Sequence, residues 1–205
     1  MNERFFGLPQ EKRLRMLNAG YRVFSTHSYK KAPMREIADA AGISKPLLFH
    51  YFGNKQALYL YLWEYAMDAA LQALARRRVD QASDLFDLLE RTLNAKCEVM
   101  AKHPHMTAFT LRAYYEQEPS ICAPIREDFA KHAREGLRLF RAAAKSTPLR
   151  EQMDIELFYK EVIWASDGFM RTAVQAGTPD PEIVRRDFGR LIAQWRDAYT
   201  PESEG

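Results

Sequence analysis

The sequence of 205 residues predicts an all-α fold of about nine helices. Apolar residues recur at spacings of three and four along almost the whole chain, as on one face of an amphipathic helix. No run alternates apolar and polar residues in the manner of a half-buried strand. Proline and glycine separate helix-sized segments, for example at Pro104, Pro119, Pro148 and Gly177.

Four helices are predicted in the N-terminal third. Pro33 can open the second helix, because a first-turn proline lacks only an N–H that would have no helical partner. Gly42 is a favourable C-cap for that helix, and Ser44 offers a hydroxyl N-cap for the third helix, which Gly53 ends. The expected ranges are 9–26, 33–42, 45–52 and 55–78.

Five further helices follow in the rest of the chain, again separated by proline or glycine. Their expected ranges are 84–103, 106–116, 119–145, 151–176 and 181–199. The fourth helix, from Lys55, is long enough to join two parts of the protein. We therefore expect a domain of residues 1–54 and a second domain of residues 55–205.

The composition is that of a globular protein, with 47% hydrophobic and 28% charged residues. No uninterrupted apolar run approaches the roughly 20 residues of a membrane span, and the N-terminus does not resemble a secretory signal. Cys97 and Cys122 are far apart and form no CxxC motif, so we expect buried thiols rather than a disulfide framework. These features favour a cytoplasmic protein.

Positive charge is concentrated at the N-terminal end. Residues 1–55 contain ten Lys/Arg and four Asp/Glu, whereas the rest of the chain contains 20 and 23. The basic end is the candidate surface for a polyanion.

The helix, turn and helix between Pro33 and Phe52 have the proportions of a helix-turn-helix, with a small residue, Ala38, where the two helices cross. The sequence of Met34–Leu58, MREIADAAGISKPLLFHYFGNKQAL, resembles the signature of the TetR/AcrR family of transcriptional regulators. The resemblance is close over about residues 10–70. It implies a DNA-binding head, a regulatory and dimerisation domain, and a homodimer that binds palindromic operator DNA.

The resemblance also implies which side chains meet DNA. Lys45 could donate to guanine or to a phosphate, His50 could contact a base edge or the backbone, and Leu47 or Pro46 could touch a thymine methyl group. Tyr51 and Lys55 correspond to phosphate contacts of the family. The full expected set is Arg35, Ser44, Lys45, Pro46, Leu47, Phe49, His50, Tyr51 and Lys55.

The chain departs from the family pattern at the start of the second helix. Family members often have Ser or Thr there, which caps the helix and binds phosphate, whereas this chain has Ala32-Pro33. Arg35 or Lys30 could replace that phosphate contact.

The resemblance further implies that a small, largely apolar effector binds among the middle helices and releases the protein from DNA. Each candidate residue also fits a plainer role in the core or at the surface. The candidates are Met100, His103, Phe109, Arg112, Tyr115, Trp164, Asp167 and Met170.

Apolar stripes on the last two helices admit two interpretations. They could face the core of their own subunit, whereas the family resemblance implies a four-helix interface with a second copy. The residues assigned to this interface are Phe158, Val162, Phe169, Phe188, Leu191, Ile192, Trp195 and Tyr199.

The sequence leaves two alternative functions open. A helical DNA- or partner-binding protein without an effector would share the same head. A metal-dependent helical enzyme would need more ligands than His103-Pro104-His105, which is more simply a turn between helices. We therefore expect a regulator, most simply a repressor, with no enzymatic activity, cofactor or metal.

Overall fold

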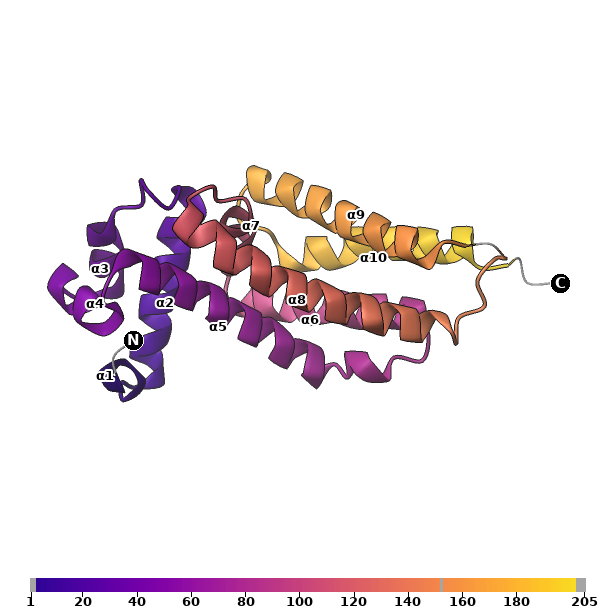
Figure 1. The fold of residues 1–205 in the computed structure, drawn as a ribbon, viewed down its shortest axis with the longest axis horizontal. Helices are drawn as coiled ribbons and strands as arrows, with labels where there is room; N and C mark the ends of the chain where they lie inside the picture. The colour runs from indigo at the N-terminus through magenta and orange to yellow at the C-terminus, as the bar shows by residue number, and fades with distance from the viewer. Residues whose placement is uncertain (1–2, 152, 202–205) are drawn as a thin grey trace. The chain divides into compact units, whose positions relative to one another are not determined.

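The computed structural model describes residues 3–151 and 153–201, and within these ranges the chain is helical and contains no strand (Figure 1). This confirms the predicted all-α fold. The helices are α1 (Glu3–Phe6), α2 (Gln10–Thr26), α3 (Met34–Ala41), α4 (Lys45–Phe52), α5 (Lys55–Arg76), α6 (Leu85–Lys102), α7 (Met106–Tyr114), α8 (Pro119–Ala144), α9 (Ile155–Ala176) and α10 (Pro181–Tyr199), with a 3-10 turn, η1 (Val79–Gln81).

Most helix ends lie within a few residues of the predicted ones, and the differences have local causes. The helix expected from residue 151 begins at Ile155, because the Asp154 side chain accepts hydrogen bonds from the N–H groups of Glu156 and Leu157. The one-turn helix α1 and the turn η1 were not predicted. Both are too short to show a helical periodicity.

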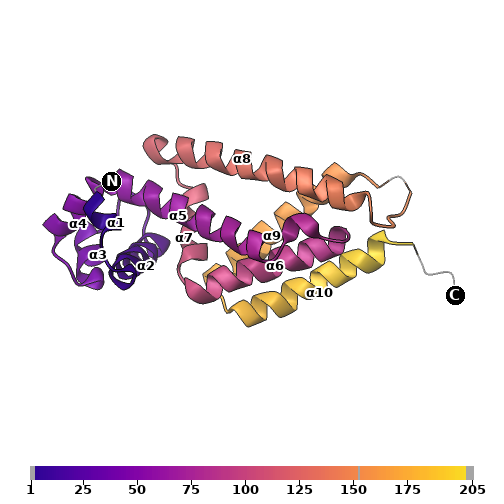
Figure 2. The same ribbon diagram turned by 90° about the horizontal axis from the view of Figure 1, so that it is seen from below.

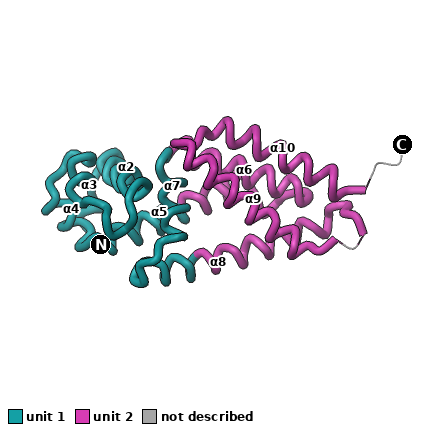
Figure 3. The backbone as a smooth tube through the Cα atoms, turned by 90° about the horizontal axis from the view of Figure 1, so that it is seen from above, with its two compact units in different colours: residues 1–68, 103–128 teal, residues 69–102, 129–205 magenta. Residues whose placement is uncertain are grey.

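The chain forms two compact units (Figure 3). Unit 1 comprises residues 1–68 and 103–128, and unit 2 comprises residues 69–102 and 129–205. The long helices α5 and α8 each contribute residues to both units. In the structure α7 therefore belongs to the same compact unit as the N-terminal helices, whereas the sequence placed it in the second domain.

The core of unit 1 is an aromatic cluster from α2, α5 and α7. The Phe109 ring centroid lies 5.3 Å from that of Tyr21 and 5.0 Å from that of Tyr59, while the Phe24 and Tyr59 centroids are 4.8 Å apart. The Tyr21 hydroxyl donates a 2.9 Å hydrogen bond to the carbonyl oxygen of Leu62. Helix α7 thus completes the core around the N-terminal helices.

Unit 2 has a separate core built from α6, α9, α10 and the second part of α8. Helices α6 and α10 lie side by side (Figure 2). Cys97 is buried there as predicted, whereas Cys122, in unit 1, is only partly buried. The large side chains of this core include Leu85, Phe86, Leu89, Met100, Phe140, Phe158, Phe188, Ile192 and Trp195.

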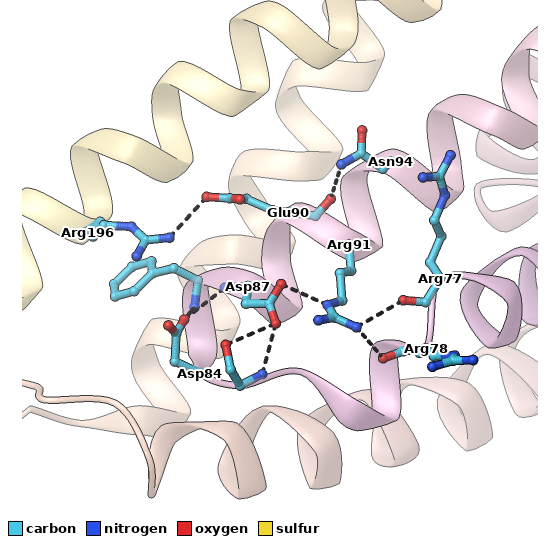
Figure 4. Close-up of polar contacts among 10 residues, drawn as sticks. Arg77, Arg78, Asp84, Asp87, Glu90, Arg91, Asn94 and Arg196 are labelled. Carbon is cyan, nitrogen blue, oxygen red and sulfur yellow. Dashed lines mark hydrogen bonds and ion pairs between the residues drawn. The ribbon is translucent and has the colours of Figure 1, made fainter.

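A polar network closes the end of α5 within unit 2 (Figure 4). Arg78 adopts a left-handed conformation with φ 49°, which turns the chain toward η1. The Arg91 guanidinium donates to the carbonyl oxygens of Arg77 and Arg78 at 3.4 and 3.2 Å, and to Asp87 Oδ1 at 2.7 Å. Asp87 Oδ2 accepts from the Ser83 N–H at 2.8 Å. One carboxylate thereby orients the arginine that satisfies this helix end.

We expect Asp87→Asn to destabilise the protein by about 1–2 kcal/mol near pH 7, because it removes charge-assisted hydrogen bonds. The Arg91 guanidinium, followed by the Ser83 N–H, lowers the pKa of Asp87 from 3.8 to about 2. A lowered carboxyl pKa stabilises the folded state above the unfolded pKa. Denaturant titrations of both proteins should show their stability difference shrinking as the pH falls from 4 toward 2. A difference that is constant over this range would contradict the prediction.

Candidate nucleic-acid interface

Helices α3 and α4 form the helix-turn-helix, and its turn depends on two residues. Gly42 has φ 70°, a left-handed conformation that costs glycine little, and the Ile43 N–H donates to the carbonyl oxygen of Ala38 at 3.0 Å. Ser44 then caps α4, its hydroxyl accepting from the Leu47 N–H at 3.3 Å. The predicted caps of both helices are therefore confirmed.

Helix α4 is buried along one narrow stripe. Leu48 and Phe52 are 0% and 2% exposed, and they pack inward with Ile37 and Ala38 of α3 in the buried core. Six of the eight α4 residues are exposed or half-buried. Among the predicted DNA-binding residues, the exposed ones are Arg35, Ser44, Lys45, Pro46 and His50, and the half-buried ones are Leu47, Phe49, Tyr51 and Lys55.

Several exposed side chains are preorganised by neighbours. The Lys45 ammonium lies 5.8 Å from the Phe49 ring centroid, a cation–π contact one turn along α4. Arg35 lies 3.8 Å from the carboxylate of Asp39 in a pair that is well exposed on both sides. Such an exposed pair contributes little to stability, so Arg35 can exchange this partner for another anion at small cost.

Lys55 has a role that its sequence position did not reveal. Its ammonium donates to the carbonyl oxygens of Lys30 and Ala32 at 3.1 and 2.7 Å, and it lies 5.2 Å from the Tyr29 ring centroid. Partial burial lowers the pKa of Lys55. The predicted phosphate contact therefore also anchors the loop between α2 and α3.

The last turn of α2 and the loop that follows it are held by residues from the end of α7 and the segment after it. Arg112 Nε donates to the carbonyl oxygen of Ser25 at 3.0 Å, and Glu116 accepts from the Tyr29 N–H at 2.9 Å. Lys30 forms a 2.9 Å ion pair with Glu118. These contacts are 87 or 88 residues apart in sequence, so no local pattern predicts them.

A sequence profile described as "Bacterial regulatory proteins, tetR family" matches residues 16–62, which contain the whole helix-turn-helix. The transcriptional activator FasR of Mycolicibacterium smegmatis is 29% identical over 126 residues, which cover 61% of this chain and 57% of FasR. The regulator RutR of Escherichia coli K12 is 26% identical over 155 residues, covering 76% of this chain and 71% of RutR.

Over residues 16–62 the chain is therefore similar to the TetR family of bacterial regulatory proteins. KstR2, a ketosteroid transcriptional regulator of Mycobacterium tuberculosis, has the same fold, with a TM-score of 0.72, 18% identity and coverage of 96% of this chain and 98% of KstR2. FadR from Bacillus subtilis, solved with stearoyl-CoA, gives a TM-score of 0.68 at 14% identity over 89% and 96% of the two chains. The relatives and neighbours named above are all described as transcriptional regulators.

The predicted effector residues do not gather in one site within either unit. In unit 1, Phe109 lies in the core, Arg112 holds the Ser25 carbonyl, Tyr115 is 41% exposed, and His103 Nδ1 lies 3.2 Å from Asn18 Oδ1. The turn at His103-Pro104-His105 joins α6 to α7, as the plainer interpretation of that motif predicted.

In unit 2 the remaining effector candidates are also dispersed. Met100 is a core residue, Met170 packs partly buried against that core, and Asp167 pairs with Arg171 at 3.0 Å. Trp164 is 63% exposed, so its role as a pocket wall stays a prediction. An indole on an open helix face encloses no ligand by itself.

The predicted dimer residues of the regulator lie mainly in the core of their own unit. Phe158, Val162, Phe188, Ile192 and Trp195 are buried, while Phe169, Leu191 and Tyr199 pack partly buried against the same core. The indole N–H of Trp195 and the hydroxyl of Tyr199 donate to the two carboxylate oxygens of Glu161 at 2.8 and 2.6 Å. This supports the alternative in which the stripes face their own subunit.

Other predictions concern membranes and metals. Among residues 3–151 and 153–201, no helix is long and apolar enough to cross a membrane. Over the same described ranges, His, Cys, Asp and Glu side chains form no cluster of three or more that could hold a metal ion.

Proposed function

We propose that the regulator is a ligand-responsive repressor that binds a palindromic operator as a homodimer. The observation that carries this proposal is the orientation of α4, in which only Leu48 and Phe52 are buried. The capped N-terminal turn, Lys45 and Pro46, is exposed, as a helix that enters a major groove requires. Residues 1–54 form the proposed DNA-reading part, and the rest of the chain regulates it.

Roles for individual residues follow from this placement. Lys45 contacts guanine or phosphate, His50 contacts a base edge, and Arg35 contacts a phosphate in place of the hydroxyl missing at Ala32. Lys55 acts mainly through the loop before α3, with one of its three N–H donors left for a phosphate. Leu47 and Pro46 offer apolar contacts to a thymine methyl group.

We place the proposed homodimer interface on the exposed face of α9, and not on the apolar stripes that the sequence suggested. Leu157 and Trp164 are 54% and 63% exposed and lie seven residues apart, so they share one helix face. Gly168 continues that face, and a Cβ placed on it would meet nothing within 4 Å. Large exposed apolar side chains on one helix face favour burial against a second copy.

The proposed effector is a small, largely apolar molecule. FadR from Bacillus subtilis was solved with stearoyl-CoA and KstR2 is named a ketosteroid regulator, and both share this fold. Helix α7 offers a route to DNA, since Arg112 near its end holds the last turn of α2 and Glu116, two residues after it, holds Tyr29 in the loop before the helix-turn-helix. An effector that favours another position of α7 would shift the population of DNA-competent heads.

Selection of genomic DNA fragments by the purified protein tests this function. We expect recovery of a sequence with two-fold symmetry whose half-sites are centred about one helical turn or a multiple of it apart. The position of that sequence relative to promoters distinguishes repression from activation. Recovery of fragments with no common sequence would contradict the proposal.

A further inference from the structure

The short helix α1 lies outside the profile match of residues 16–62 and belongs to unit 1. One turn is closed by the Gly7 N–H, which donates to the carbonyl oxygen of Glu3 at 3.2 Å, and by the Leu8 N–H, which donates to that of Phe5. A single turn is unstable alone in water, so its helical form depends on tertiary contacts.

Those contacts come from Phe5, which is completely buried between α4 and α5. Its ring centroid lies 4.8 Å from that of Phe52, 6.1 Å from that of Tyr51 and 5.7 Å from that of Tyr61. Phe52 and Tyr51 are the last two residues of α4. Phe5 thus attaches α1 to the C-terminal end of the helix that we propose reads DNA.

The residue before this anchor is Arg4, whose side chain is exposed and directed toward α4. Its Nη1 atom lies 3.4 Å from Nε2 of His50. The eight residues of α4 include no acid, and Lys45 adds a second cation to the same helix. Arg4 therefore extends the positive surface of α4 with a residue from outside the helix-turn-helix.

We propose that Arg4 contacts a DNA phosphate at the edge of the groove that α4 enters, so that the DNA-binding surface includes α1. The proposal rests on the proposed function of α4. A guanidinium presents paired donors that match phosphate oxygens, and its charge would add to that of Lys45. The Phe5 anchor reduces the ordering cost of this contact, because Arg4 is already held beside His50.

The test measures duplex affinity against salt concentration for the full-length protein, Arg4→Gln and Arg4→Lys, on a selected operator and on a random duplex of equal length. Lys131→Gln, which removes an exposed charge from α8 in unit 2, is the control. We expect Arg4→Gln to lower affinity for both duplexes by about fivefold at low salt, and to reduce the slope of log K against log salt by about 0.9 per bound subunit. Its melting temperature should be unchanged.

Arg4→Lys should restore most of the slope, and Lys131→Gln should match wild type. A wild-type slope in Arg4→Gln would overturn the phosphate contact, because a merely structural Arg4 would not alter counterion release. Failure of the proposed function is distinguishable. It would appear as a wild-type protein with no preference for the selected operator, whatever the behaviour of Arg4.

Discussion

Trp164→Glu is expected to dissociate the homodimer and to lower operator affinity by at least about a hundredfold. A charge in the centre of a desolvated apolar interface leaves an unpaired buried carboxylate, which is far more costly than the loss of one contact. Each half-site must then be bound separately, so the advantage of simultaneous binding is lost. Sedimentation and operator titration of the variant measure both effects.

Leu71→Glu is the matched control for this substitution, because Leu71 is also an exposed apolar residue, at 45%, but lies on α5. It should remain dimeric and bind the operator as wild type does. A dimeric Trp164→Glu protein with normal operator affinity would show that α9 is not the interface.

Phe109→Ala should destabilise unit 1 by about 3–5 kcal/mol, the usual cost of removing a buried phenylalanine. Phe109 is fully buried, and its ring contacts rings from both α2 and α5. Its loss would leave a cavity between α7 and the N-terminal helices. Denaturant unfolding measures the free-energy change.

Tyr115→Ala provides the comparison, since Tyr115 was a second effector candidate but is 41% exposed. It should cost less than about 1 kcal/mol, as most surface substitutions do. A mild effect of Phe109→Ala on unfolding, together with an altered effector response, would return Phe109 to its predicted place in a ligand pocket.

The helices were predictable because their signals are local. Ser44 and Gly42 act within four residues of their own positions, and both cap their helices in the structure as predicted. The exposure of most α4 side chains was also predictable in part, since the family resemblance covers that helix. Local capping signals and a matched motif were together sufficient to predict the helix-turn-helix of α3 and α4.

The features that the sequence did not predict depend on contacts between residues that are distant in sequence. An apolar stripe such as Phe188, Ile192 and Trp195 on α10 has the same spacing whether it faces its own core or a partner, so periodicity could not choose. The hydrogen bonds from Lys55 to the carbonyls of Lys30 and Ala32 were not predicted, because these residues lie more than 20 positions away in sequence. Phe5 carries no local sign of burial, because its partners come from α4 and α5.

The central claim is that α4 reads the operator. The most direct test is a competition experiment in which the selected operator and a random duplex compete for the same protein. It compares wild type with the double variant Lys45→Ala, His50→Ala. Both side chains are exposed, so the fold should survive their removal. We predict that wild type prefers the operator and that the double variant loses at least about tenfold of this preference, as expected for the loss of base contacts worth about 1–3 kcal/mol each. A double variant with the full wild-type preference would contradict the account.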